Sequence, residues 1–230
     1  MKKIFLYCSI FLVLFVLPKL NADDMQDNVI LQYRYGIGGG MGVSAISVNE
    51  VVSYLNLLYI PDIYSRISEF SSSIEFFGSY DHFINPNFAA GFEYSYLLGS
   101  HNISTGFGSN DFTYSYHMPL LLGHYVLGGS EYFFKFGGGL GYIFARFKED
   151  LAALPDAIVY TGGGIGGKAQ AVGHTPFGDN LFGYIGVEMR FAFPGSVHDD
   201  EGKALTDGRD DVSLNFFSFG LKFGLMYYFN

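Results

Sequence analysis

Eight charged residues lie within segments where apolar and polar residues alternate, and their spacing suggests ion pairs in a closed interior. They are Arg34, Glu75, Glu93, Lys135, Lys168, Glu188, Arg190 and Lys222. Counted along the predicted strands from the side of the chain ends, Glu188 and Lys222 lie at the same depth in neighbouring strands. Arg34 lies at a similar depth. We expect Glu188 to pair with Lys222 or Arg34, because an unpaired charge in a narrow interior would cost several kcal/mol.

The remaining acidic groups of this interior, Glu75 and Glu93, are expected to pair with Lys135 or a neighbouring cation. Two interpretations of such a lumen network remain open. A salt-bridged plug would fill a narrow lumen, as side chains do in an eight-stranded barrel. The same groups could instead form a gated path for protons or ions.

Other residue types that could do chemistry are weaker candidates. His101, Ser104 and Asp111 are the nearest approach to a hydroxyl nucleophile with its base, and we expect them in or beside an outer loop. The acidic stretches 198–201 and 207–211 lack the ligand spacing of a calcium-binding loop. We therefore expect no catalytic residue, no metal site and no cofactor.

The elements that must position these charges show a period of two. In the last segment, Phe217, Phe219, Leu221 and Phe223 begin a wholly apolar face that continues to Phe229, and the intervening residues are mostly small, polar or charged. Segments 181–193 and 29–43 repeat the pattern. Because successive side chains of a strand point to opposite faces, these segments are predicted to be strands with one apolar face.

Five further segments alternate less cleanly, namely 72–81, 87–98, 111–126, 131–147 and 157–172. Eight strands, separated alternately by short and longer connections, predict a closed antiparallel transmembrane β-barrel with both chain ends on the side of the short turns. The expected long connections are 44–71, 99–110, 148–156 and 194–211. A secreted β-sandwich is the alternative, but here charge is concentrated in the connections.

The first long connection contains a run, 49–59, that could form a short amphipathic helix. It would be capped by Ser47 or Asn49 and stopped at Pro61, with another turn or two in 62–70. The range 46–60 could equally extend the flanking strands, because short apolar runs are ambiguous.

The N-terminus resembles a secretory signal, with two lysines followed by a fourteen-residue apolar core. We expect residues 1–22 to be a signal peptide and 23–230 to be one barrel domain. The chain has 25 Phe and 18 Tyr, and its single cysteine lies within the signal. The net charge of −9, with no basic patch, excludes a nucleic-acid partner.

The C-terminal residues Lys222, Gly224, Tyr227 and Phe229 are similar to the assembly signal of outer-membrane barrel proteins, although Asn230 follows the final aromatic residue. Residues 29–229 resemble small eight-stranded barrels of the OmpA, OmpX and OmpW kind. That resemblance implies location in the bacterial outer membrane. It also implies lipids and lipopolysaccharide as surroundings, with periplasmic chaperones and the barrel-assembly machinery as partners during biogenesis.

These barrel families include adhesins, anchors, channels and a few lipid enzymes, so the resemblance leaves several functions open. The first hypothesis is a non-enzymatic barrel whose outer loops contact an extracellular ligand or support envelope integrity. The second is a narrow, porin-like channel for small or apolar solutes. The third is a lipid A-modifying enzyme, for which His101 with Ser104 and Asp111 would be the candidate site.

Overall fold

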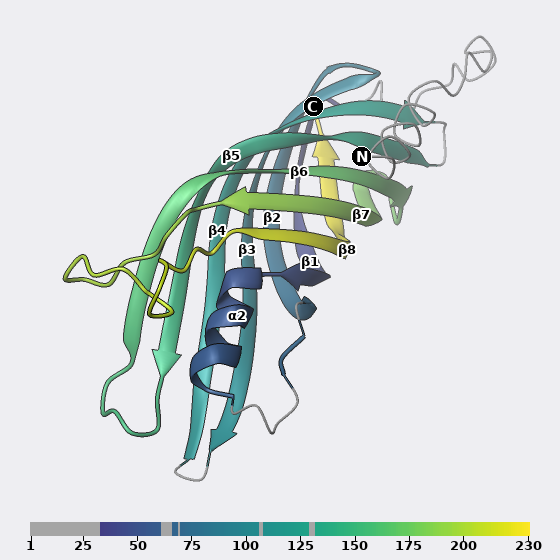
Figure 1. Ribbon diagram of the computed structural model, residues 1–230. Coiled ribbons are helices and arrows are strands. Elements are labelled where there is room, and N and C mark those ends of the chain that lie inside the picture. Colours follow the sequence, from purple (N-terminus) through teal and green to yellow (C-terminus); the bar gives the residue numbers. More distant parts are fainter. Residues whose placement is uncertain (1–32, 61–65, 69, 106–107, 129–131) are drawn as a thin grey trace, which may run out of the picture.

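A computed structural model describes residues 33–60, 66–68, 70–105, 108–128 and 132–230. Eight antiparallel strands form a closed barrel in simple chain order, in which β1 also pairs with β8 (Figure 1). The strands are β1 (Tyr35–Ser47), β2 (Phe70–Asn85), β3 (Phe88–Thr105), β4 (Gly108–Gly128), β5 (Phe133–Asp150), β6 (Ile158–Pro176), β7 (Leu181–Phe193) and β8 (Phe216–Phe229). The predicted all-β barrel is confirmed.

The alternation of the sequence becomes an apolar belt around the outside of the barrel. On β5, every second residue from Phe134 to Phe144 points outward, and the large side chains among them are 43–66% exposed. Ten residue steps of about 3.3 Å cover about 33 Å along a strand. A tilt of about 40° reduces this to about 25 Å, which is the height of the apolar band of outer-membrane barrels.

All eight predicted strands are present in the predicted order, and β7 and β8 have the expected bounds. The expected outer loop at 99–110 is wrong, because β3 and β4 remain paired up to Thr105 and Gly108. This stretch is rich in Ser, Gly and Asn, so no apolar face marks it as strand. Pro119 fits within β4 because the ladder to β5 is interrupted between His117 and Leu120, where no bond is required of the proline.

The first long connection does form a helix, α2 (Asn49–Leu58), so the alternative of extended strands across 49–58 is wrong. The expected cap is also wrong. The N-cap residue is Val48, which makes no side-chain capping bond, and the Ser47 hydroxyl instead donates to the Asn49 side chain at 2.6 Å. Pro61 and most of the predicted second turn lie outside the described residues.

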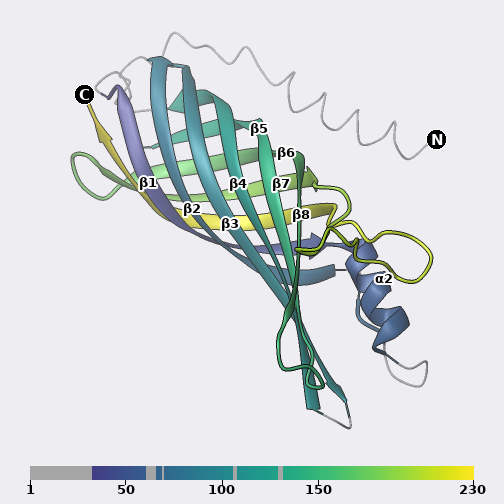
Figure 2. The same cartoon turned by 90° about the vertical axis from the view of Figure 1, so that its left-hand side faces the viewer.

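The two ends of the barrel differ. We call the end where β1 begins and β8 finishes the terminal end, and the opposite end the loop end; the strands there extend furthest at β3, β4, β5 and β6 (Figures 1 and 2). The loop end carries α2 and the connection 194–215. Among the described residues, no helix is long and apolar enough to cross a membrane. The predicted signal peptide 1–22 lies outside the described residues.

Candidate functional site: a closed lumen

A layer of buried charges crosses the middle of the lumen, and we call it the charged layer. Its members are each 5% exposed or less: Glu75 on β2, Glu93 on β3, Lys168 on β6, Glu188 and Arg190 on β7, and Lys222 on β8. They all occupy inward positions of the two-residue repeat. The layer contains three carboxylates and three cations and is therefore electrically balanced.

The strand register brings the charged layer together and glycines make room for it. Gly42 on β1 lies opposite Glu75 on one side and Lys222 on the other. A Cβ at Gly42 would lie 3.1 Å from a Glu75 carboxylate oxygen and 2.9 Å from the Leu221 carbonyl. Glu188 similarly lies opposite Gly220 on β8. Glycines on one strand thus leave space in which the long charged side chains of the neighbouring strands can meet.

The carboxylates of the charged layer share their cations. Glu93 contacts Lys168, accepts a hydrogen bond from the Lys222 ammonium at 2.9 Å, and lies 3.7 Å from the Arg190 guanidinium. Glu188 lies 2.9 Å from Arg190, 3.4 Å from Lys168 and 3.8 Å from Lys222. Each cation thus bridges two or more acids, which offsets the cost of removing these groups from water.

Glu75 depends on a single cation. Its carboxylate contacts the Arg190 guanidinium, and within the described part of the chain no other cation lies within ion-pair distance of it. Its second oxygen has no hydrogen-bond partner. Arg190, which is fully buried, therefore supplies the positive charge that compensates the Glu75 carboxylate.

A second ion pair lies in the lumen nearer the terminal end. Lys135 contacts Asp81, and His124 Nδ1 lies 3.7 Å from the same carboxylate. The Gln170 amide is 2.7 Å from His124 Nε2 and accepts a bond from Lys222 at 3.4 Å. This polar chain joins the Asp81–Lys135 pair to the charged layer.

One predicted interior position, that of Arg34, and one predicted pairing, that of Lys135, need correction. Arg34 does not enter the network, because it is exposed and precedes the first residue of β1, where its backbone N–H bonds to the Phe229 carbonyl. Lys135 pairs with Asp81 rather than with Glu75 or Glu93. Sequence reasoning missed Asp81, although it has the same inward parity as Glu75 on β2.

Apolar clusters close the lumen on both sides of these charges. The terminal-side cluster consists of Phe77, Phe83, Ala89, Val126, Phe133, Val172, Phe182, Tyr184, Met226 and Tyr228. The loop-side cluster is larger and includes residues of α2, β4, β5, β8 and the connection 194–215. Between the clusters, the polar region beside Asp81 and His124 holds a cavity of only about 20 Å³ for the centres of water molecules. That volume admits about one water.

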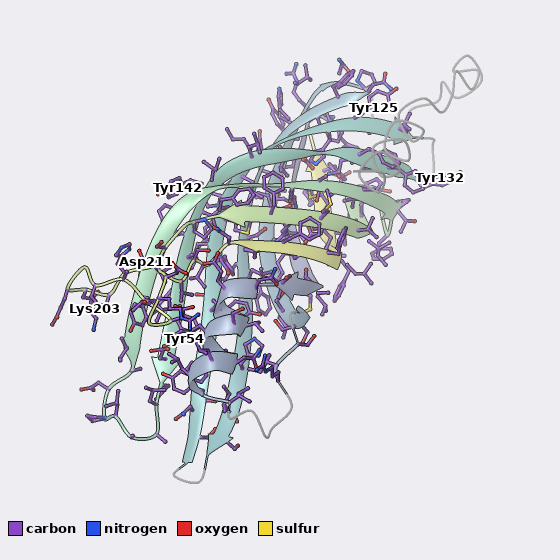
Figure 3. The ribbon with its side chains drawn as sticks, viewed as in Figure 1. Tyr54, Tyr125, Tyr132, Tyr142, Lys203 and Asp211 are labelled. Carbon is purple, nitrogen blue, oxygen red and sulfur yellow. The ribbon has the colours of Figure 1, made fainter. Side chains whose placement is uncertain are left out.

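Helix α2 completes the loop-side closure. Val51 and Leu55 are fully buried in the loop-side cluster, as are Phe112 and Leu214. The Tyr54 hydroxyl donates to Glu149 of β5 at 2.6 Å, and the Tyr54 side chain lies between α2 and the barrel wall (Figure 3). Burial, together with the bond to Glu149, raises the pKa of the Tyr54 hydroxyl, so it stays protonated as a donor.

A second contact ties α2 to the connection 194–215. The carboxylate of Glu50, in the first helical turn, accepts the backbone N–H of Ser213 at 2.7 Å. The helix and this connection therefore hold each other over the mouth of the barrel.

The other residues considered for chemistry do not form a site. His101 and Ser104 belong to opposite faces of β3, because their positions along the strand differ by three. Asp111 accepts a hydrogen bond from Asn102 on the Ser104 face. Asp199 and Asp207 each use a carboxylate oxygen to accept backbone N–H groups of their own turns.

The buried carboxylates of Glu75, Glu93 and Glu188 come within 4.8 Å of one another, which is close enough to share a metal ion. However, Lys168, Arg190 and Lys222 already neutralise them. The charged layer therefore has no surplus negative charge with which to hold a cation.

The residues similar to an assembly signal all lie on β8. Lys222 points inward to the charged layer, and Tyr227 and Phe229 lie on the outward face with ring centroids 6.2 Å apart. A Cβ at Gly224 would lie 2.4 Å from the Gly39 carbonyl oxygen. Glycine is required there because β1 and β8 approach closely where the barrel closes.

No family model and no curated protein matches this chain. Solved structures do. The attachment invasion locus protein of Yersinia pestis, Ail, in complex with the heparin analogue sucrose octasulfate, is 10% identical with a TM-score of 0.50; the match covers 86% of this chain and 99% of Ail. Neisserial surface protein A is 13% identical with a TM-score of 0.52, covering 85% and 97%. At these identities the likeness shows the fold alone, that of small eight-stranded outer-membrane β-barrels.

Proposed function

We propose that this chain is a non-enzymatic, non-conducting barrel of the bacterial outer membrane that anchors an external surface. The observation that carries the proposal is the closed lumen. A neutral layer of six buried charges lies between two apolar clusters, and the cavity among them admits about one water. Such packing among the described residues supports a lumen without a continuous aqueous path, and we therefore assign activity to the loop end.

The distribution of structure along the barrel supports this assignment. Strands β3 to β6 extend beyond the apolar belt at the loop end, where they support α2 and the connection 194–215 (Figure 2). We infer that the loop end faces outward and contacts an extracellular ligand. The termini would then lie in the periplasm, because outer-membrane barrels have short periplasmic turns and longer external loops.

Biogenesis follows from the same proposal. The chain would be exported by residues 1–22, escorted by periplasmic chaperones and inserted by the barrel-assembly machinery. Lys222, Gly224, Tyr227 and Phe229 would serve as the recognised C-terminal signal. Lipopolysaccharide and phospholipid would surround the exposed apolar belt.

Outer-membrane fractionation and planar-bilayer conductance test the proposal together. We expect the full chain in the outer membrane, with different gel mobility before and after heating, and near-zero conductance. A Glu188→Gln variant should conduct equally little, because the apolar clusters remain closed. Recovery in the soluble fraction would refute the membrane assignment. Reproducible single-channel currents that change in the variant would instead favour the porin-like hypothesis.

A further inference from the structure

The outer face of the barrel has a groove at the loop-side edge of the apolar belt. It lies across β4, β5 and β6 and has a volume of about 380 Å³. Its wall includes His117, Tyr142, Phe144, Arg146, Thr161 and Gly163. Tyr142 lies on the outside of β5, away from the lumen (Figure 3). The groove is therefore separate from the charged layer and open to the surroundings of the belt.

A glycine in the groove gives the Tyr142 ring room to lie across β6. Gly163 is the residue of β6 that pairs with Phe144 of β5, and a Cβ there would lie 2.6 Å from the Tyr142 hydroxyl oxygen. The aromatic rings of Tyr142 and Phe144 pack at 4.9 Å between centroids and form one apolar side. The groove is thus continuous with the lipid-facing belt below it.

A single unpaired cation stands at the top of this groove. Arg146 is the first charged residue beyond the belt on the outward face of β5. Within the described part of the chain, it makes no ion pair or side-chain hydrogen bond. Lys148, two residues further along the same face, is paired with Asp150 at 2.9 Å. Arg146 alone therefore offers a free guanidinium at this level.

Polar groups flank this guanidinium. Thr161 is the direct partner of Arg146 across the β5–β6 ladder and is exposed. His117 is half-buried at the groove, and its Nδ1 lies 2.5 Å from the Tyr94 hydroxyl, which leaves Nε2 for another bond. A guanidinium can donate two parallel hydrogen bonds to a phosphate, and a neighbouring hydroxyl and imidazole can donate further ones.

We propose that this groove binds the phosphorylated headgroup of an outer-leaflet glycolipid, the lipid A part of lipopolysaccharide. The phosphate would pair with Arg146, and an acyl chain would lie along Tyr142 and Phe144. Three observations support this ligand class: the height of Arg146 at the edge of the belt, the continuity of the groove with that belt, and an isolated cation in a chain of net charge −9. The inference rests on the proposed outer-membrane location.

Titration of the purified, detergent-solubilised full chain with lipid A, followed by native mass spectrometry, tests the site. We compare wild type with Arg146→Gln, and with Lys148→Gln as the matched control on the same face. Loss of a charge-assisted contact should weaken binding of bisphosphorylated lipid A about tenfold in Arg146→Gln. Lys148→Gln should bind within about twofold of wild type. Heat-dependent gel mobility verifies that all three proteins fold.

Three other outcomes would contradict the proposal. Equal binding of lipid A from which both phosphates have been removed would overturn the phosphate contact. Unchanged affinity in folded Arg146→Gln would overturn the assigned residue, and equal binding of phosphatidylglycerol would overturn the choice of glycolipid. In each of these cases a folded protein in the outer-membrane fraction leaves the proposed function standing. Wild-type protein in the soluble fraction would remove the proposed function itself.

Discussion

Replacing Arg190 by Met should destabilise the barrel more than any single change at its surface. Arg190 is fully buried and contacts Glu75 and Glu188, with Glu93 3.7 Å away. Met preserves much of the length of the side chain but removes the charge. The balanced layer would then carry one uncompensated negative charge, and Glu75 would lose its ion-pair partner.

The size of the effect follows from burial. Opposite charges 2.9 Å apart, the Arg190–Glu188 separation, attract by about 6 kcal/mol at an effective dielectric constant of about 20. Part of this lost attraction is offset, because Met can be buried without the cost of desolvating a guanidinium. Breaking a buried pair by removing one partner costs about 3–5 kcal/mol, and we expect a loss of that size in the free energy of unfolding.

The assay is reversible unfolding of the barrel in phospholipid vesicles with urea or guanidinium chloride. Far-UV circular dichroism and gel mobility serve as the probes, because the chain has no tryptophan. Lys148→Met is the control, since it breaks an ion pair whose side chains are 42% and 54% exposed and should cost less than about 1 kcal/mol.

A second variant isolates the charge from the packing. Arg190→Met combined with Glu75→Gln restores neutrality and should recover at least about 2 kcal/mol of the loss. The reasoning would be refuted if Arg190→Met unfolded within about 1 kcal/mol of wild type. It would also fail if the double variant were no more stable than the single one, because packing rather than charge would then explain the loss.

Two further predictions concern the loop end. Tyr54→Phe removes the hydrogen bond to the buried Glu149 and should speed hydrogen exchange of the α2 amides about tenfold, with exchange in the barrel strands unchanged. Unaltered exchange in α2 would contradict the role of this bond in holding the helix over the barrel mouth. The second prediction concerns Asp207, where hydrogen bonds from the backbone N–H groups of Asp210 and Arg209 hold the pKa of the carboxyl below its usual value. Because the pKa is lowered in the folded turn, the ionised carboxylate stabilises the turn fully above the ordinary carboxyl pKa. This stabilisation is lost as the pH falls through the lowered pKa. Carboxyl NMR titration should therefore give a midpoint below that of an unstructured aspartate, and protection of the Arg209 amide should fall in the same pH window; a normal midpoint would contradict this.

Sequence reasoning succeeded where one face of a strand contributes to the exposed apolar belt. Segments 181–193 and 216–229 were predicted with their observed bounds because a belt facing hydrocarbon demands an apolar residue at every second position. It failed for 99–110, where the strands leave the belt and polar residues occupy both faces. There, pairing between β3 and β4 depends on backbone hydrogen bonds that no side-chain pattern records.

For the interior charges too, the sequence predicts some properties and only the structure shows the others. Alternation could place Glu75, Glu93 and Lys222 inside the lumen, because facing is a local property of a strand. It could not identify Arg190 as the partner of Glu75, which is 115 residues away along the chain. Nor could it show that Arg34 precedes β1 and stays exposed, since the exact first residue of a strand depends on its neighbours.

Patterning along the chain thus determined that eight strands form, which faces turn outward and that the inward faces carry charge. These properties follow from the two-residue repeat of a strand and the demand of an apolar surrounding. Only the closed barrel decided which charges meet, that they balance, and that α2 and the connection 194–215 seal the mouth. Those contacts join residues on different strands, and their distances depend on register, tilt and closure together.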